Sequence, residues 1–259
     1  MVLAKGSERQ KFAGSAAGPM QERGAMRRYE KWFSPALYRD MELLHFGWAG
    51  FPVVAFPTSM GRFFQYEDSG TIARLQGKLE RGELQLVCVD SVDAESWYND
   101  QAPPQARGAR HEQYDAYLTN EVVPYVRHAS GRDDLGVFGC SFGGYHAANV
   151  AARHPELVAK AVCFSGVYDV GRFTDGHWDD TDYRNSPAEF VPNLDDVAIE
   201  RLRRIDWVIA TGENDALAGD NRHFDEILTR RGIPHHTEIW PGITGHDWPY
   251  WNDAVVRLL

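Results

Sequence analysis

The sequence has few cysteines, no excess of basic residues and no long hydrophobic run. Three cysteines in 259 residues, Cys88, Cys140 and Cys163, are too few and too scattered for a disulfide framework or a thiolate metal site, which favours a reducing, cytoplasmic location. Lys and Arg number 27 against 37 Asp and Glu, giving a net charge of −10, so nucleic acid is not expected as a partner. Apolar runs such as residues 51–56 are far shorter than the roughly 18 to 20 residues of a membrane-spanning helix, so no membrane partner is expected either.

The composition is that of a globular protein, with 43% hydrophobic and 25% charged residues. At this length one α/β domain can bury roughly three quarters of the surface of its unfolded chain, so we expect a single domain over residues 26–259. Residues 1–25 alternate charge with Gly and Ala and lack the apolar segment of a signal peptide, which predicts a flexible tail. The sequence leaves open whether the protein forms a homo-oligomer.

The pattern of apolar residues predicts an α/β fold. Two β-type segments around Pro35, residues 27–34 and 38–47, predict an antiparallel hairpin at a sheet edge. Short apolar runs without alternation follow, as expected for strands covered by helices on both faces. These runs are residues 52–56, 84–90, 135–139, 160–166, 206–212 and 235–240.

Segments with apolar residues every three or four positions separate most of these runs and predict helices. Strands that alternate with helices form a mainly parallel, doubly wound sheet, in which ligands bind beyond the carboxyl ends of the strands. The predicted helices cover residues 68–82, 110–128, 143–157, 219–232 and 247–259. Residues 167–194 interrupt the alternation with Gly, Asp, Trp and Pro, and we expect them to form an insertion that roofs a site at that edge.

The strongest chemical signal is a G-x-S-x-G motif over residues 139–143. It lies between a predicted strand and a predicted helix, which is the context of a nucleophile elbow. Gly139 and Gly143 lack the β-carbons that would collide in so sharp a turn, so the hydroxyl of Ser141 can stand above the sheet. We therefore predict that Ser141 is a nucleophile, the alternative being an ordinary glycine-rich turn.

A serine hydroxyl needs a base to take its proton, and an elbow predicts an acid and then a histidine later in the chain. Asp215 follows the strand at 206–212, and His246 follows the last strand, so both are expected at the same sheet edge as Ser141. The other candidate acids are Glu213, Asp220 and Asp225. Asp220 and Asp225 fit structural positions at a helix start and on a helix face, which leaves Asp215 favoured and Glu213 next.

Acyl transfer also requires hydrogen-bond donors for the developing oxyanion. The backbone amide of Phe142, directly after the nucleophile, is the expected first donor. The second should come from the loop at residues 57–61, where Ser59 and Met60 are the candidates, unless that loop is a simple turn ended by Gly61.

At these residues the sequence resembles the esterase family of the α/β-hydrolase fold, the grouping around esterase D, feruloyl esterases and mycolyltransferases. The resemblance implies a single-domain α/β-hydrolase fold over about residues 27–259, with Ser141 as nucleophile, His246 as general base and acid, and Asp215 as the carboxylate that orients the imidazole. One departure stands out, because Pro57 and Thr58 replace the His-Gly pair common in such esterases. The resemblance is carried by residues 139–145, 165–169, 185–187, 211–215 and 245–251.

Three further predictions concern the surroundings of this site. Trp97 and Tyr98 follow the strand at 84–90 and are expected to face the pocket and bind an acyl or aromatic group, with edge packing as the alternative. Cys140 is expected to pack below the elbow as a small hydrophobic residue. The acids around His177, which are Asp175, Asp179, Asp180 and Asp182, could hold a hard cation, but a solvated loop is favoured and no metal is predicted.

Three functions remain to be compared. The first is a cofactor-free serine esterase that hydrolyses small or aryl carboxylic esters through an acyl-enzyme. The second is an acyltransferase that passes the acyl group to an alcohol or thiol. The third is a non-catalytic binding scaffold, against which the presence of Ser141, Asp215 and His246 in the required order argues.

Overall fold

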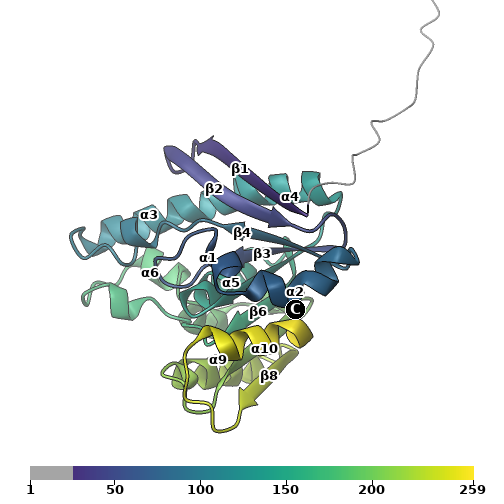
Figure 1. Cartoon of the computed structure of the whole chain (residues 1–259). Coiled ribbons are helices and arrows are strands. Elements are labelled where there is room, and N and C mark those ends of the chain that lie inside the picture. The colour runs from purple at the N-terminus through teal and green to yellow at the C-terminus, as the bar shows by residue number, and fades with distance from the viewer. Residues whose placement is uncertain (1–25) are drawn as a thin grey trace, which may run out of the picture.

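Eight strands form one sheet in this computed structural model, which describes residues 26–259 (Figure 1). The sheet order is β1-β2-β4-β3-β5-β6-β7-β8. Strand β2 pairs antiparallel with β1 on one side and with β4 on the other, and every other neighbouring pair is parallel. The predicted edge hairpin and the mainly parallel sheet are thus confirmed, whereas the tail predicted for residues 1–25 lies outside the described residues. The strands are β1 (Arg27–Ser34), β2 (Arg39–Phe46), β3 (Phe51–Phe56), β4 (Leu84–Val89), β5 (Leu135–Cys140), β6 (Val158–Phe164), β7 (Asp206–Gly212) and β8 (His235–Trp240).

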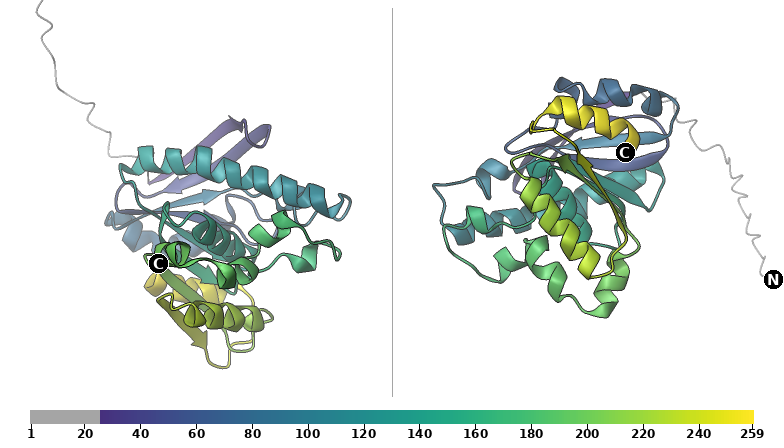
Figure 2. Two further views of the ribbon diagram at one scale, coloured as in Figure 1. Left: turned by 180° about the vertical axis from the view of Figure 1, so that it is seen from behind. Right: turned by 90° about the horizontal axis from the view of Figure 1, so that it is seen from below.

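Helices connect the strands from β3 onward and cover both faces of the sheet (Figure 2). No helix in the described part of the chain is long and apolar enough to cross a bilayer. The α-helices are α1 (Gln65–Asp68), α2 (Thr71–Glu80), α3 (Pro104–Tyr117), α4 (Val123–Ser130), α5 (Phe142–Arg153), α6 (Asp180–Arg184), α7 (Pro187–Phe190), α8 (Asp196–Leu202), α9 (Ala218–Arg230) and α10 (Trp248–Leu258). The short 3-10 helices are η1 (Asp93–Glu95), η3 (Gly171–Phe173) and η4 (Val191–Asn193), and η2 (Leu118–Val122) is a π-helical turn.

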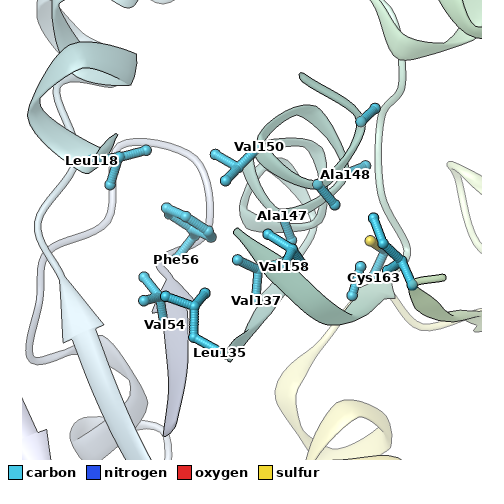
Figure 3. Packing of buried hydrophobic residues seen from close by; sticks show 14 of the residues in the cluster. Val54, Phe56, Leu118, Leu135, Val137, Ala147, Ala148, Val150, Val158 and Cys163 are labelled. Atoms are coloured by element: carbon cyan, nitrogen blue, oxygen red, sulfur yellow. The ribbon is translucent and has the colours of Figure 1, made fainter. Parts of the chain in front are cut away.

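The alternation of side chains along the central strands produces two cores. In β3, Val54 and Phe56 pack into one cluster with residues of α3, α5 and α9, shown in part in Figure 3. Val53 and Ala55 point to the opposite face, where α2 and α10 pack side by side. Both faces of the parallel strands are therefore buried, which is why their sequences are apolar throughout rather than alternating.

The helix predicted over residues 110–128 is longer than expected and contains an irregularity. Helices α3 and α4 run on through η2, where the amide of Val123 bonds to the carbonyl of Leu118, five residues earlier. Pro124 follows directly, and a proline inside a regular helix lacks an amide and clashes with the carbonyl four residues before it. The π-helical turn moves the preceding carbonyls, so the helix continues past the proline.

Residues 167–194 contain η3, α6, α7 and η4 instead of a single crossover helix. The segment is joined to itself by buried hydrogen bonds, with Ser186 Oγ accepting from the amide of Val170 at 3.1 Å. Helix α8, which completes the crossover to β7, was not predicted from the sequence because its seven residues give too short an apolar repeat.

A buried histidine in the hairpin makes stability depend on pH. His45 in β2 is fully buried, with Nδ1 2.9 Å from Nη2 of Arg28 and Nε2 3.1 Å from Oε1 of Gln85. Burial, and then the charge of Arg28, lower the pKa of His45 from 6.5 to about 4.

We expect His45 to destabilise the folded protein as the pH falls from about 6.5 to about 4. Over that range the unfolded chain binds a proton at this site and the folded chain does not, so the contribution present above pH 6.5 is lost, up to about 3 kcal/mol. Urea unfolding at pH 7.5 and pH 5 should show a smaller pH-dependent loss for His45→Gln than for wild type. The exposed His128→Gln serves as control, and equal losses in all three proteins would contradict the expectation.

Candidate active site

Ser141 occupies the turn between β5 and α5, and its backbone is strained. Its φ of 57° and ψ of −124° are rarely adopted by residues with a side chain, and its amide is held by the carbonyl of Phe164 at 2.8 Å. A β-carbon on Gly139 would lie 2.0 Å from the carbonyl oxygen of Gly143, and one on Gly143 would lie 2.3 Å from that of Phe56. The turn can therefore form only with glycine at both positions, as the motif indicates.

His246 and Asp215 come from two other loops at the same edge of the sheet. His246 lies between β8 and α10, and Asp215 follows β7. The Nε2 atom of His246 is 2.8 Å from Oγ of Ser141, and its Nδ1 is 3.0 Å from both carboxylate oxygens of Asp215. The structure thus brings the three predicted residues into one hydrogen-bonded chain in the order serine, imidazole, carboxylate.

The environment of Asp215 keeps it ionised. Its side chain is completely buried, and burial alone raises the pKa of a carboxyl group. Hydrogen bonds from His246 and from the amide of Leu217, the latter at 2.7 Å, outweigh burial and lower the pKa of Asp215 below its ordinary value. A carboxylate that stays charged can hold the Nδ1 hydrogen of His246 and stabilise the imidazolium that forms when Nε2 takes a proton.

The other acids weighed in the sequence have different partners. Glu213 Oε2 accepts the amide of Gly242 at 2.8 Å, Asp220 pairs with Arg172 at 2.6 Å, and Asp225 lies 3.0 Å from Nε2 of His235. None of the contacts of these three acids involves His246.

A tryptophan that sequence reasoning missed supports the His246 ring. Trp251, one turn into α10, packs edge to face against it with ring centroids 4.9 Å apart, and its own Nε1 donates to Oγ of Ser165 at 3.2 Å. The Trp251 side chain is 3% exposed, so the ring of His246 rests on the core. Residues 245–251 carried the family resemblance, but His246 lies in the loop before α10, so no local sequence pattern indicates its contact with Trp251.

The loop at 57–61 follows β3 and lies beside the elbow. The amide of Met60 donates to Oδ2 of Asp93 at 2.9 Å, and that of Thr58 donates to Oε1 of Gln65 at 2.8 Å. Among the described residues, neither the Ser59 amide nor the Phe142 amide at the start of α5 has an acceptor. Of the two loop candidates, Met60 has its amide engaged and Ser59 has its amide available.

The two aromatic residues predicted to bind substrate differ in accessibility. Trp97 is 1% exposed and packs against the elbow helix in a cluster with Phe142 and Tyr145, so the expectation that it faces the pocket is wrong. The packing of Trp97 corresponds to the alternative given from the sequence, a packing role. Tyr98 is half-buried, and its hydroxyl lies 2.7 Å from Oγ of Ser59. Its ring lies 5.0 Å from those of Phe142 and Phe173, so Phe173 brings the 167–194 segment to the elbow.

Cys140 and the acidic cluster around His177 have structural positions in the fold. Cys140 is completely buried under the elbow, and burial raises its pKa well above the ordinary thiol value. His177, Asp179 and Asp182 have side-chain atoms within 4.8 Å of one another, but Asp179 and Asp182 form the capping box that begins α6. Helix capping therefore accounts for the position of these two carboxylates.

Sequence reasoning also missed Asp93 and His146, which join in a buried pair beside the loop at 57–61. Nε2 of His146 lies 2.9 Å from Oδ1 of Asp93, and each residue is 1% exposed. The available signal was that His146 stands among mostly small and apolar residues at 142–152, a segment that the structure buries throughout, since a buried polar side chain requires a partner.

Comparisons with known proteins agree with this geometry. A family model described as "Esterase: Putative esterase" matches residues 65–259, and no curated protein matches the chain. A ferulic acid esterase superposes with a TM-score of 0.74 at 18% identity, covering 90% of this chain and 96% of that one. The S-formylglutathione hydrolase of Staphylococcus aureus gives 0.67 at 23% identity, covering 91% and 96%, and that of Agrobacterium tumefaciens gives 0.70 at 15%, covering 91% and 93%. The chain therefore belongs to this esterase family and is an enzyme of the α/β-hydrolase fold that acts on carboxylic esters.

Proposed function

We propose that the protein hydrolyses small or aryl carboxylic esters through an acyl-enzyme formed on Ser141. The observation that carries the proposal is the unbroken chain from Ser141 Oγ to Nε2 of His246 at 2.8 Å and from Nδ1 to Asp215 at 3.0 Å. Nucleophile, base and orienting carboxylate are then in place before substrate binds.

In the first half of the reaction Oγ of Ser141 attacks the ester carbonyl carbon while its proton passes to Nε2 of His246. The C–O bond to the alcohol breaks as the tetrahedral intermediate collapses, and the imidazolium returns the proton to the leaving alcohol. Water then repeats the sequence on the acyl-enzyme, with His246 again as base, and releases the carboxylic acid. Asp215 stays ionised throughout and holds the imidazole in the tautomer that this sequence needs.

The oxyanion of each tetrahedral intermediate is stabilised by the amides of Phe142 and Ser59. Both belong to residues at the elbow edge, and neither amide has an acceptor within residues 26–259. The amide of Met60 is unsuited to this role, because it already donates to the Asp93 carboxylate. The absent His-Gly pair is therefore replaced by a main-chain donor that the side chains of Gln65 and Asp93 hold in place.

We expect Ser59→Pro to lower kcat by about 10²- to 10³-fold, because proline removes the proposed amide donor. Ser59→Ala keeps the amide and loses only the contact with Tyr98, so its kcat should stay within about threefold of wild type. Initial rates on p-nitrophenyl acetate provide the measurement, with circular dichroism to check that the proline variant folds. Equal rates for Ser59→Pro and wild type would exclude Ser59 as a donor.

A phosphonate bound to Ser141 gives a direct view of the same contact. Its oxygen should lie within roughly 2.7–3.1 Å of the amide nitrogens of Phe142 and Ser59. An oxygen held by Oγ of Ser59 instead would move the donor from the main chain to the side chain.

The substrate class is supported by the apolar wall beside the elbow. Tyr98 and Phe173 are half-buried, and both rings pack edge to face against Phe142, which places aromatic surface next to the nucleophile. Flat aryl groups gain from such surfaces both by burial and by ring-to-ring contact. We propose that the 167–194 segment roofs the site through Phe173.

A hydrolysis screen tests the proposal as a whole. The protein should cleave p-nitrophenyl and aryl esters across a range of acyl lengths, and Ser141→Ala should remove that activity. Transfer of the acyl group to an added alcohol in preference to water would instead identify an acyltransferase. A wild-type protein that turns over none of these esters and reacts with no fluorophosphonate would be a binding scaffold.

We also propose a cytoplasmic location. The three cysteines are all free and buried, and burial raises the pKa of Cys88, Cys140 and Cys163 above the ordinary thiol value. The fold thus depends on no disulfide that an oxidising compartment would have to form.

A further inference from the structure

One buried carboxylate connects the loop at 57–61 to the nucleophile helix. Asp93, in η1 after β4, accepts the amide of Met60 on Oδ2 at 2.9 Å and the Nε2 hydrogen of His146 on Oδ1 at 2.9 Å. A carboxylate can only accept, so Nε2 of His146 is the donor. The side chains of Asp93 and His146 are almost completely enclosed, so the contact between them is shielded from water.

The loop needs such a connection because its backbone is unfavourable. Met60 has a φ of 56°, in the left-handed region that residues with a side chain seldom adopt. Its side chain is 55% exposed and contributes little packing of its own, so the hydrogen bond to Asp93 is a principal restraint on this residue. The amide of Ser59, the proposed oxyanion donor, belongs to the residue directly before it.

His146 attaches the other end of the connection to the second proposed donor. It lies four residues after Phe142 in α5, on the same face of the helix. The two rings pack edge to face with centroids 5.0 Å apart, and His146 also contacts Phe56 at the end of β3, with centroids 5.6 Å apart. The Asp93–His146 pair therefore contacts both Phe142 and the loop at 57–61, and links their positions.

Stability alone is a weak reason for this arrangement. Removing a carboxylate from water costs nearly as much as its buried pairing returns, and apolar side chains of similar size often serve as well in a core. What an apolar replacement cannot supply is an acceptor of fixed position for the Met60 amide.

We propose that Asp93 and His146 are positioning residues that set the distance between the two halves of the oxyanion hole. The proposal rests on the proposed esterase function of this site. Neither residue touches the substrate. Asp93 holds the loop through Met60, and His146 fixes the orientation of the Asp93 carboxylate.

The decisive comparison is between His146→Phe and His146→Gln. Phenylalanine keeps the ring and loses the donor, whereas the side-chain amide of glutamine can still donate to Asp93. We expect kcat on p-nitrophenyl acetate to fall about 10- to 100-fold in His146→Phe, less than the 10² to 10³ of a lost donor because the donor is displaced rather than removed. KM should change by less than about threefold, and His146→Gln should recover kcat to within about threefold of wild type.

Asp93 variants provide the second test. Asp93→Ala removes both hydrogen bonds and should match His146→Phe in kcat. Asp93→Asn should be milder, because its oxygen can accept from Met60 while its NH₂ group donates to the other tautomer of His146. Should Asp93→Ala fail to fold, Asp93→Asn and the His146 pair still decide the matter.

The matched control is the His154–Asp115 pair at the other end of α5, where Nε2 lies 2.9 Å from Oδ1. His154→Phe removes a similar contact far along the helix from Ser141 and should leave kcat unchanged. The pH profile of kcat/KM should be the same in His146→Phe as in wild type, because the triad is intact. A shifted profile would place His146 in the triad's own network and overturn the positioning role.

Hydrogen exchange separates this inference from the proposed function. Exchange of the Met60 amide should be faster in His146→Phe and Asp93→Ala than in wild type and His146→Gln. A wild type without esterase activity would refute the proposed function. Unchanged exchange of the Met60 amide in both variants would refute the positioning role, whether or not the wild type is active. Wild-type kcat in His146→Phe and Asp93→Ala would refute it as well.

Discussion

Replacing Ser141 or His246 by alanine should abolish ester turnover, with losses in kcat on the order of 10⁶-fold. Ser141 supplies the bond to the acyl group and His246 moves the proton that makes the bond possible, so either loss stops the same step. Rates on p-nitrophenyl acetate, followed at high enzyme concentration, measure the residual activity. The double variant should be no slower than either single one, because members of a triad act as a unit.

The same variants should fold normally. Ser141 is partly exposed and the His246 side chain is 29% exposed, so neither truncation opens a core cavity. Thermal unfolding within a few degrees of wild type would confirm that activity, not folding, is lost. Full turnover by folded Ser141→Ala protein would contradict the acyl-enzyme mechanism.

Replacing Asp215 by asparagine should lower kcat by about 10⁴-fold and leave measurable activity. The amide fills the same buried space and can still accept from Leu217, which bonds to Oδ1 at 2.7 Å. It can no longer stabilise an imidazolium, and its NH₂ group favours the tautomer of His246 with hydrogen on Nε2, which cannot take the proton of Ser141.

Glu213→Gln is the matched control, two residues away in the same loop. The glutamine oxygen can still accept the amide of Gly242, so kcat should stay within about twofold of wild type. If Glu213→Gln were crippled and Asp215→Asn ran normally, the orienting acid would be Glu213.

Local patterns were enough to predict the strands and the elbow. The parallel strands are covered on both faces, so their uninterrupted apolar runs appear directly in the sequence. The turn at Ser141 requires glycine at 139 and 143 for purely local steric reasons, since each would place a β-carbon against nearby backbone. Helices α6, α7 and α8 were missed, because four to seven residues carry too little periodicity.

The surroundings of the elbow could not be predicted in the same way. The sequence placed Trp97 and Tyr98 side by side as equal candidates, yet one is buried against Phe142 and the other lies beside Ser59. It left Ser59 and Met60 undecided as donors, because the choice depends on Asp93, which is more than thirty residues away in the chain.

The fold class, the elbow and the order in which its partners follow could therefore be predicted from the sequence alone. These depend on periodicity and on steric requirements within a few residues, so they can be read locally. The contacts of His246 with Asp215, the free amide beside Ser141 and the carboxylate that accepts from the loop at 57–61 became known from the tertiary structure alone. Those contacts join side chains from different strand ends, and hydrogen bonds only a few ångströms long depend on the packing of the whole sheet.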